Sequence, residues 1–584
     1  MEDDLPSKYE VIVIGTGMTE SIVAAAASRI GKRVLHLDGN DYYGGMWASF
    51  TFEALQKWLN ECQSGKTLEN SKESTSLICE KEKAVSIGNQ FSTVFNIEEK
   101  WFIPEKLPSN CNFQSAKITQ TEESPKENKD GEIESETTLK QNDKLWCQEK
   151  IKSLGRKFNM DLAPKLLFSR GTLVELLISS NISRYAEFRC VNRILTWLDN
   201  KLETVPCSRA DVFATKNVSL IEKRQLMQLL TLCVEYKPEC DEFKGFEDKT
   251  LKEYLENKKL TKNLMHYVLY AIAMSNDKTP CMIGVERTQR FLSSLGRYGN
   301  TPFLWPMYGT GELPQCFCRL CAVFGGVYHL KRAANSIVVS DNQCKAIISD
   351  GSRLDCDHLV LGVSDAPPEF LGAAPKAGLS RGIFIIDRSI STNDKESLTL
   401  LQFPIKGKEP ITIIEAGPST HVCPPGLYIL HMTTRQVDNA FNDLKPAVDK
   451  LLHCDFADGT TTRIDTDTQS TQTPKEKDTT ASNTKLNDQA NILKPQLLYS
   501  LYFNCPETSE YDLSRNVPSN VHLCSGPDLE IDYEFAVKQA KTIFSSMYPN
   551  SEFLPRAPDP EELSLEVDEA AGPPFQGTEE PKEE

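Results

Sequence analysis

Residues 9–50 read YEVIVIGTGMTESIVAAAASRIGKRVLHLDGNDYYGGMWASF and contain the signals that decide the fold. The apolar run Val11–Ile14 ends at a glycine and predicts a buried parallel strand. The alanine-rich segment Ser21–Ile30 predicts a helix, and Val34–Asp38 predicts a second strand. A strand, a glycine turn, a helix and a strand in this order predict a βαβ unit of the Rossmann type.

The glycine loop of this unit departs from the dinucleotide-binding pattern. That pattern, G-x-G-x-x-G, is met by Gly15 and Gly17, but Glu20 stands in place of the third glycine. Two unit charges about 4 Å apart cost roughly 4 kcal/mol at an effective dielectric constant near 20, so a carboxylate here would repel a pyrophosphate. We therefore expect a Rossmann scaffold that binds no dinucleotide and no other cofactor. Glu20 could itself occupy the anion position, and Asp38, with no ribose to bind, is expected to hydrogen-bond the next loop.

Three polar stretches are predicted to be disordered, because they hold too few apolar side chains to offset chain entropy. They are residues 115–145, within an insert at 64–149, a Thr-rich loop at 458–488 and an acidic tail at 556–584. Thr121–Lys144, the loop and the tail together hold 24 acidic and 10 basic side chains. Most of the formal charge of −17 therefore lies outside the predicted folded part, whose near-neutral charge disfavours a nucleic-acid partner.

The remaining residues predict an α/β protein with two domains. The helical period dominates between about residues 161 and 295, and short strand patterns occur on either side of this region. Leu497–Phe503 and His522–Ser525 are predicted to be strands that return to the first sheet. We expect a discontinuous, FAD-binding-type Rossmann-like domain with a mixed sheet, and an inserted, mostly helical second domain. The first takes residues 1–63, 150–160, 205–218, 285–457 and 489–555, and the second takes 161–204 and 219–284.

The sequence carries no signal for export or for a membrane span. Its start is acidic, unlike a signal peptide, and no stretch of about 18 apolar residues is present. Eighteen cysteines without a secretory signal indicate reduced thiols and a cytoplasmic location. Cys318 and Cys321 form a C-x-x-C pair near Cys316, but zinc requires four ligands and the sequence has no second pair. We therefore expect buried cysteines and no metal site.

A second informative stretch, residues 296–328, reads GRYGNTPFLWPMYGTGELPQCFCRLCAVFGGVY. It predicts a helix over Pro314–Val323, with Gln315 and Arg319 on one face and Glu312 close to them. Such a cluster beside exposed tyrosines suits a protein-binding platform. The alternative interpretation is a solvated helix face with local ion pairing.

Both quoted stretches resemble the Rab GDP-dissociation inhibitor and Rab escort protein family, whose members are similar in fold to flavin oxidoreductases. The pair Tyr42-Tyr43 before two glycines is part of this resemblance. Val327 and His329 stand where the inhibitors usually carry Thr and Met. The resemblance implies a Rab-binding platform made of Tyr43, Arg156, Arg297, Glu312, Gln315 and Arg319.

The long insert, the acidic tail and several short strings resemble escort proteins more than the compact inhibitors. These strings include Cys207–Phe213, Glu222–Met227, Leu501–Cys505 and Cys524–Asp528. The resemblance implies an accessory protein without catalytic residues, which binds newly made GDP-bound Rab GTPases and presents them to the Rab geranylgeranyltransferase alpha/beta heterodimer. It then shields the geranylgeranyl lipid and delivers the Rab through transient membrane contact. A recycling inhibitor, and a flavin oxidoreductase on the same fold, are the alternatives.

A prenyl chain requires an apolar groove, and the segment Leu264–Met274 is apolar on nearly all sides. Met265, Leu269 and Met274 are therefore candidate groove residues, the methionines because their flexible side chains suit an adaptable surface. A helix that is apolar all round is also typical of buried core. Both interpretations stay open on the sequence.

Overall fold

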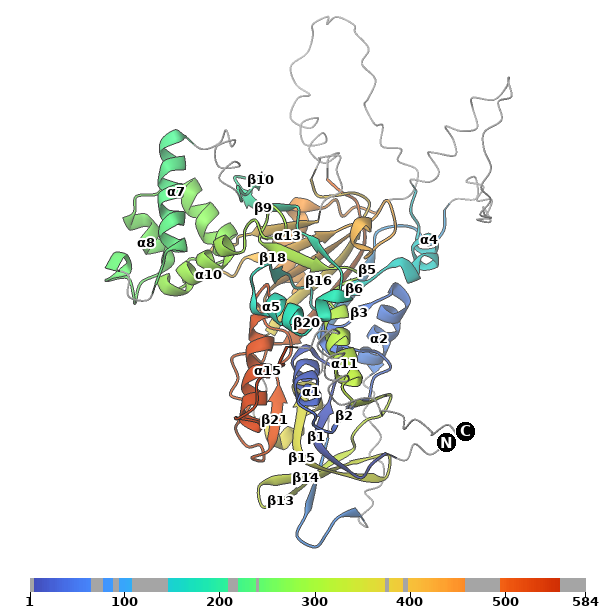
Figure 1. Ribbon diagram of the computed structural model, residues 1–584. Helices are drawn as coiled ribbons and strands as arrows, with labels where there is room; N and C mark the ends of the chain where they lie inside the picture. Colours follow the sequence, from blue (N-terminus) through green and yellow to red (C-terminus); the bar gives the residue numbers. More distant parts are fainter. Residues whose placement is uncertain are drawn as a thin grey trace, which may run out of the picture.

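The computed structural model describes residues 5–64, 77–87, 94–107, 145–207, 219–237, 241–372, 378–391, 398–456 and 494–556 (Figure 1). The stretches predicted to be disordered lie outside these residues, apart from Leu145 and Arg556 at their ends. Two parts of the predicted insert at 64–149 form strands, β4 (Lys83–Ser86) and β5 (Phe95–Trp101), and each pairs with a different main sheet.

The first main sheet contains the predicted βαβ unit at its centre. Its order is β12–β2–β1–β15–β14–β13–β4, and β21 also pairs with β15. β1 lies parallel to both β2 and β15, as the apolar run of the first strand predicts for a position inside a sheet. The other bounds are β1 Lys8–Ile14, β2 Val34–Asp38, β12 Val327–Leu330, β13 Ser336–Ser340, β14 Gln343–Ser349, β15 Ser352–Gly362 and β21 Val521–Cys524.

Helix α1 (Met18–Arg29) packs against the first sheet and is itself covered by two helices. These are α11 (Glu312–Val323) and α15 (Glu534–Met547), from distant parts of the chain. Every residue of α1 from Met18 to Ser28 is buried, because the small alanine side chains let both helices approach closely. The predicted helix α11 thus sits beside the glycine loop that precedes α1.

The second main sheet has the order β10–β9–β17–β18–β19–β16–β20–β5, and α13 (Ala440–Leu451) packs on it. The prediction that Leu497–Phe503 joins the first sheet is wrong, because this segment lies in β20 (Leu497–Pro506) between β16 and β5. An apolar strand buried on both faces gives no local signal for the sheet that it joins. The other bounds are β9 Arg193–Leu198, β10 Lys201–Thr204, β16 Gly378–Ile386, β17 Thr399–Phe403, β18 Ile411–Ala416 and β19 Tyr428–Arg435.

Short elements connect the two sheets. β7 (Leu167–Phe168), β11 (Phe303–Pro306) and β8 (Phe188–Cys190) form one small sheet, and β3 (Ser49–Phe50) pairs with β6 (Met160–Asp161). The helical turns and short helices around them are η1 Gly45–Trp47, α2 Phe52–Ser64, α4 Gln148–Ser153, η3 Gly155–Lys157, α5 Thr172–Ser179, η4 Ile182–Arg184, η7 Val363–Asp365, α12 Pro368–Leu371 and η8 Pro418–Thr420. The prediction of a mostly helical 161–204 is therefore wrong, since the region holds β7 to β10 besides α5 and η4.

Residues 219–293 form a helical lobe, which projects from one end of the second sheet (Figure 1). It contains α7 (Leu220–Val234), η5 (Asp241–Phe243), α8 (Leu251–Asn257), α9 (Lys262–His266), a π-helix, η6 (Tyr267–Ile272), and α10 (Cys281–Ser293). Capping boxes at Ser219 and Thr250 start α7 and α8. The predicted limit at residue 284 lies inside α10, and the apolar core of the lobe continues into that of the second sheet. In the part of the chain that the structure describes, no helix is long and apolar enough to cross a membrane.

Candidate functional site

The glycine loop is bonded to the strand end that follows it. Thr16 donates two hydrogen bonds to Asp38 Oδ2, from its backbone nitrogen at 3.0 Å and from Oγ1 at 2.6 Å. Asp38 Oδ1 accepts from the backbone and the side chain of Asn40, at 2.8 and 2.9 Å. The expectation that Asp38 bonds the next loop is confirmed, because both its oxygens are engaged by this chain.

The Glu20 side chain fills the space beside the same loop. It is 5% exposed, and its Oε2 has no hydrogen-bond partner. A Cβ atom on Gly362 would lie 2.6 Å from Oε1, and a Cβ atom on Gly15 would lie 3.2 Å from Asp365 Oδ2. Burial is the main cause that raises the pKa of Glu20 to about 8, and the charges of Asp365 and Asp38 add to it. Burial therefore favours the protonated, neutral form of this carboxyl near pH 7.

These carboxyls do not fit the dinucleotide that Rossmann-type folds commonly bind. A pyrophosphate needs backbone N–H groups and open space at the helix N-terminus. Here Glu20, Asp38 and Asp365 surround the loop, and burial also raises the pKa of Asp365 to about 7. The buried Glu20 side chain occupies the space beside the loop that a pyrophosphate would need, so the loop does not fit a dinucleotide.

The exposed face of α11 carries the three side chains that the sequence analysis predicted to lie close together. Glu312, Gln315 and Arg319 are all exposed, whereas the opposite face packs on α1. The helix starts two residues earlier than predicted, because the preceding backbone is anchored. Thr310 N donates to Asp161 Oδ1 at 2.9 Å, and Gly311 N donates to Ser49 Oγ at 2.8 Å.

Aromatic side chains lie beside this face. The Arg319 guanidinium stacks over the Tyr185 ring at 4.7 Å, and the Tyr185 hydroxyl donates to Cys316 O. Val323, at the end of α11, is 68% exposed. The solvated-face interpretation expects local ion pairing on this helix. Among the described residues, Glu312 and Arg319 form no ion pair with each other. The face instead presents unpaired polar groups next to apolar ones.

Tyr43 lies next to α11. Its ring meets the edge of Tyr328 at 6.4 Å between centroids, and Tyr328 bonds His36. Burial raises the pKa of Tyr43, with a smaller contribution from Cys318 of α11. The structure thus brings Tyr43 close to the helix that carries Glu312, Gln315 and Arg319.

Arg297 and Arg156 lie on separate segments. Arg297 forms an ion pair with Glu175 of α5 and donates to Ser169 O at 2.7 Å. Arg156 is exposed on η3, three residues before Asn159, whose side chain donates to His421 O at 2.7 Å. Among the described residues, no hydrogen bond, ion pair or ring contact joins either arginine to the exposed side chains of α11, whereas Tyr43 lies near Cys318 of that helix.

The candidate groove residues divide into two kinds. Leu269 is 2% exposed and belongs to the core that the lobe shares with the second sheet. Met265 and Met274 are half-buried and pack against that core. Met274 also has a positive φ of 46° and lines a cleft of about 590 Å³.

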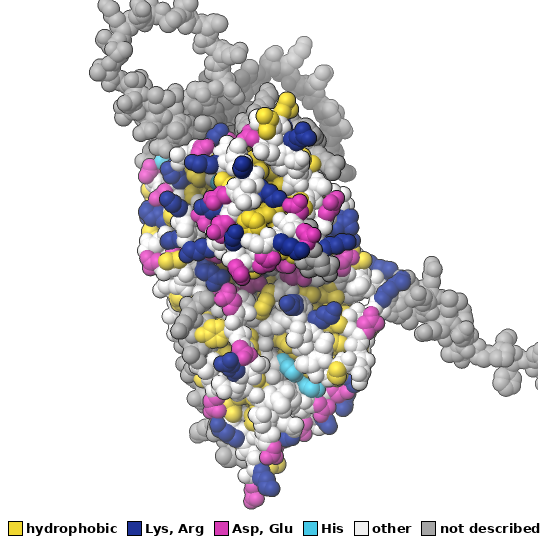
Figure 2. Space-filling model, turned by 90° about the vertical axis from the view of Figure 1, so that its left-hand side faces the viewer, with side chains coloured by type: hydrophobic (Ala, Val, Ile, Leu, Met, Phe, Trp, Pro, Cys, Tyr) yellow, Lys and Arg dark blue, Asp and Glu magenta, His cyan; other side chains and the backbone are white. Residues whose placement is uncertain are grey.

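This cleft lies between the helical lobe and the second sheet, and the sequence analysis did not predict it. Its walls come from the end of η6, α10, the chain around β18, and residues 507–510 and 528–531. Ion pairs such as Arg287–Glu530 and Arg435–Glu507 line it beside Met274 and Ile283. The lining residues come from parts of the chain between Phe168 and Phe535, so no local pattern could have predicted the cleft. Over the lobe surface, charges of both signs alternate with apolar patches (Figure 2).

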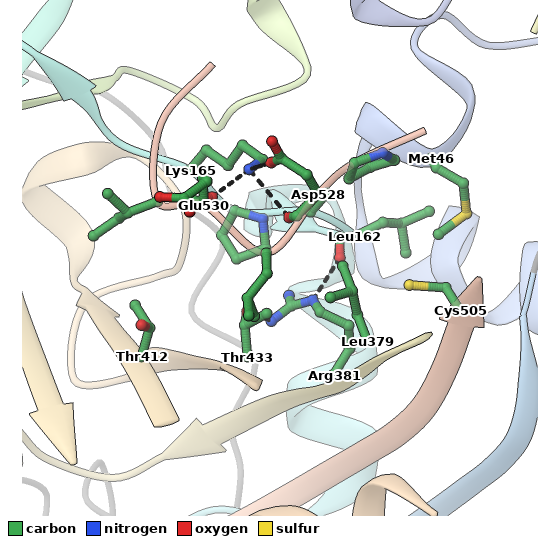
Figure 3. A pocket seen from close by; sticks show the side chains of 15 residues that line it. Met46, Leu162, Lys165, Leu379, Arg381, Thr412, Thr433, Cys505, Asp528 and Glu530 are labelled. Carbon is green, nitrogen blue, oxygen red and sulfur yellow. Dashed lines mark hydrogen bonds and ion pairs between the residues drawn. The ribbon is translucent and has the colours of Figure 1, made fainter. Parts of the chain in front are cut away.

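A smaller pocket, of about 20 Å³, is closed by internal bonds (Figure 3). Lys165 pairs with Asp528 and also donates to Glu530 O. Arg381 Nε donates to Leu162 O at 2.8 Å, and burial lowers the pKa of Arg381 to about 10. The pocket has room for about one water, and its buried polar contacts join the second sheet to residues 162–165 and 527–531.

The cysteines near α11 are core residues, as predicted. Cys316, Cys318 and Cys321 are buried, and Cys318 Sγ lies 3.2 Å from Ser21 Oγ of α1. Within the described ranges, no three His, Cys, Asp or Glu side chains are grouped so that they could hold a metal ion.

The chain with this two-sheet scaffold and helical lobe matches a known protein family. The profile of the family described as GDP dissociation inhibitor matches residues 2–78 and 127–483, and the chain belongs to this family. Within it, the chain is similar to human Rab proteins geranylgeranyltransferase component A 1, with 37% identity covering 97% of this chain and 95% of that protein. Human component A 2 is 36% identical, with 97% and 95% covered, and the Drosophila melanogaster component A is 35% identical, with 97% and 93% covered.

Among solved structures, the Rab GDI of Plasmodium falciparum has a similar fold. The TM-score is 0.57 and the identity 18%, over 94% of this chain and all of that one. The expected fold class, a Rossmann-like domain with a mixed sheet and a helical second part, is confirmed by this likeness and by the sheets described above.

Proposed function

We propose that this chain is a Rab escort protein, an accessory component of Rab geranylgeranyltransferase without catalytic residues of its own. It binds newly made GDP-bound Rab GTPases and presents them to the catalytic alpha/beta heterodimer. It then shields the geranylgeranyl groups and delivers the Rab from the cytosol by transient contact with membranes. The observation that carries the proposal is the 37% identity to a component A protein over 97% of this chain.

The exposed face of α11 is the surface we propose for Rab binding. Arginine and tyrosine are enriched in protein interfaces, and polar groups with no partner of their own can pair across an interface at little cost. Glu312, Gln315 and Arg319 are such groups, with Tyr43 and Tyr185 beside them. We propose Arg297 and Arg156 as outer contacts of the same platform.

The helical lobe is the part that we propose for shielding the lipid. Each CH₂ group that leaves water contributes about 0.8 kcal/mol, so an isoprenoid chain requires a continuous apolar surface. Met265 and Met274 are half-buried on the lobe and belong to this proposal. Leu269 is fully buried, so it lies beneath such a surface and contacts the lipid only if the core opens.

The experiment is prenyl transfer from labelled geranylgeranyl diphosphate to one purified Rab by the transferase heterodimer, with and without this chain. Transfer that depends on the chain supports the escort function. Absent transfer together with tight binding of prenylated GDP-bound Rab would indicate a recycling inhibitor. The double variant Glu312→Ala/Arg319→Ala is expected to lose Rab binding while it keeps its thermal stability, and Arg515→Ala is a matched control, because Arg515 is 80% exposed and pairs only within its own loop.

A further inference from the structure

We propose that Thr16, at the centre of the glycine loop, is a positioning residue for Tyr43. Its hydroxyl links the Asp38 carboxylate to the Gly44 backbone and so fixes the loop that presents Tyr43 to the partner GTPase. This inference rests on the proposed function, in which Tyr43 belongs to the Rab-binding platform.

The geometry at Thr16 is that of a complete bridge. Thr16 is 1% exposed, and its Oγ1 donates to Asp38 Oδ2 at 2.6 Å. The same Oγ1 accepts from Gly44 N at 2.9 Å. The hydroxyl thus uses its only proton toward the carboxylate and a lone pair toward the amide, an arrangement that valine cannot reproduce and serine can.

The segment from Asn40 to Gly44 is held at both ends, with Tyr43 between them. At its start, Asn40 donates to Asp38, and Asn40 O accepts from Lys331 N at 2.9 Å. At its end, Gly44 has φ of +97°, a conformation that favours glycine, and its amide reaches Thr16. Fixing this amide fixes the backbone direction immediately after Tyr43.

The glycine loop also holds the ring of Tyr43 from a second side. Gly15 O is bonded to His36 Nε2, and His36 Nδ1 is bonded to the Tyr328 hydroxyl. The Tyr328 ring in turn meets the Tyr43 ring. The loop therefore acts on Tyr43 through its backbone by way of Thr16, and through its side chain by way of His36 and Tyr328.

In dinucleotide-binding members of this fold class, the glycine loop faces the pyrophosphate and the acidic residue at the second strand end binds the ribose. Here Asp38 occupies that strand end, and its oxygens bond Thr16 and Asn40 instead. Thr16 and Asp38, at positions that contact the nucleotide in those proteins, thus bond the ends of the loop that carries Tyr43.

The test compares Thr16→Val with Thr16→Ser in the full-length chain. Binding of one purified GDP-bound Rab is measured by titration, and exchange of the Gly44 amide is measured by hydrogen–deuterium exchange. Thr16→Val is expected to weaken binding roughly three- to tenfold and to speed Gly44 exchange, as expected for the loss of one bridging hydroxyl, whereas Thr16→Ser stays within about twofold of wild type. In a Tyr43→Ala background, Thr16→Val is expected to change the affinity less than about twofold, because the residue through which it acts is gone.

Unchanged affinity of a folded Thr16→Val variant would overturn the proposal, and so would an equal loss in the Tyr43→Ala background. If Thr16→Val does not fold, Thr16→Ala, which also lacks the hydroxyl, takes its place with the same expected results in the wild-type and Tyr43→Ala backgrounds. A wild-type chain that binds no Rab at all would contradict the proposed function. In that case, faster Gly44 exchange in Thr16→Val would still support the bridge, and unchanged exchange would exclude it.

Discussion

The Glu20 carboxyl lies directly against Gly17: a Cβ atom on Gly17 would come within 2.5 Å of Glu20 Oε2. The glutamate therefore folds back over the loop that starts its own helix. A side chain at position 17 would overlap with Glu20, and this overlap explains the glycine without a bound phosphate.

The first prediction is that Gly17→Ala destabilises the protein through Glu20. The backbone at Gly17 has φ of −62°, which alanine adopts freely, so the cost comes from overlap and from alanine's lower preference for the N-cap position of α1. We expect the free energy of unfolding to fall by roughly 1–3 kcal/mol, the usual cost of overpacking. In a Glu20→Ala background the same substitution should cost much less, which urea denaturation of the four proteins measures. Equal costs in both backgrounds would contradict the contact.

The second prediction concerns pH. Because burial raises the pKa of Glu20 to about 8, the folded state holds a proton that the unfolded state releases near its ordinary pKa of 4.5. The unfolded state then binds fewer protons, so stability falls as pH rises from about 5 to 8, by up to about 1.4 kcal/mol per pH unit for one group. Glu20→Gln removes this contribution and should make the slope less steep, while Asp365, whose pKa burial raises to about 7, still contributes; denaturant unfolding at pH 5, 6, 7 and 8 measures the difference. Glu53→Gln, at an exposed position of α2, is the control that should leave the slope unchanged.

The local elements could be predicted well, because their signals lie within a few residues. The second strand, Val34–Asp38, has the predicted bounds, since an apolar run and a glycine boundary determine it. The grouping of Glu312 with Gln315 and Arg319 also follows from helix periodicity alone.

Long-range relationships could not be predicted in the same way. The strand starting at Leu497 was correct as a strand, but its partner, β16, lies more than 100 residues earlier in the chain. Arg297 resembled a platform residue by family position, yet its contact with Glu175 depends on the packing of α5. Periodicity specifies which face of an element is apolar, and the fold decides what covers that face.

The third prediction separates the two arginines of the platform. Arg297→Ala removes a bond to Ser169 O and an ion pair with a largely exposed glutamate, so we expect a loss of about 1 kcal/mol in unfolding free energy. Arg319→Ala removes only a stacking contact at the surface and should change stability by less than about 0.5 kcal/mol. For Rab affinity we expect the opposite order, because Arg319→Ala should lose more affinity than Arg297→Ala. Denaturation and titration of both variants measure this, and an Arg319→Ala protein with full affinity would exclude Arg319 from the interface.

The last prediction tests the two interpretations of the apolar helix in the lobe. Leu269→Ala removes a side chain from the shared core and should cost roughly 2–4 kcal/mol of stability whether or not a lipid binds. Met265→Glu places a charge at a half-buried surface position, so the fold should persist while the affinity for prenylated Rab drops by tenfold or more, about 1.4 kcal/mol, if this surface holds the lipid. Asn263→Glu adds the same charge at an exposed position of α9 and should leave that affinity intact, which separates an apolar contact from general repulsion. The decisive comparison is between prenylated and unprenylated Rab, because a groove residue affects only the first. A folded Met265→Glu protein that binds prenylated Rab normally would show that Met265 lies outside the groove.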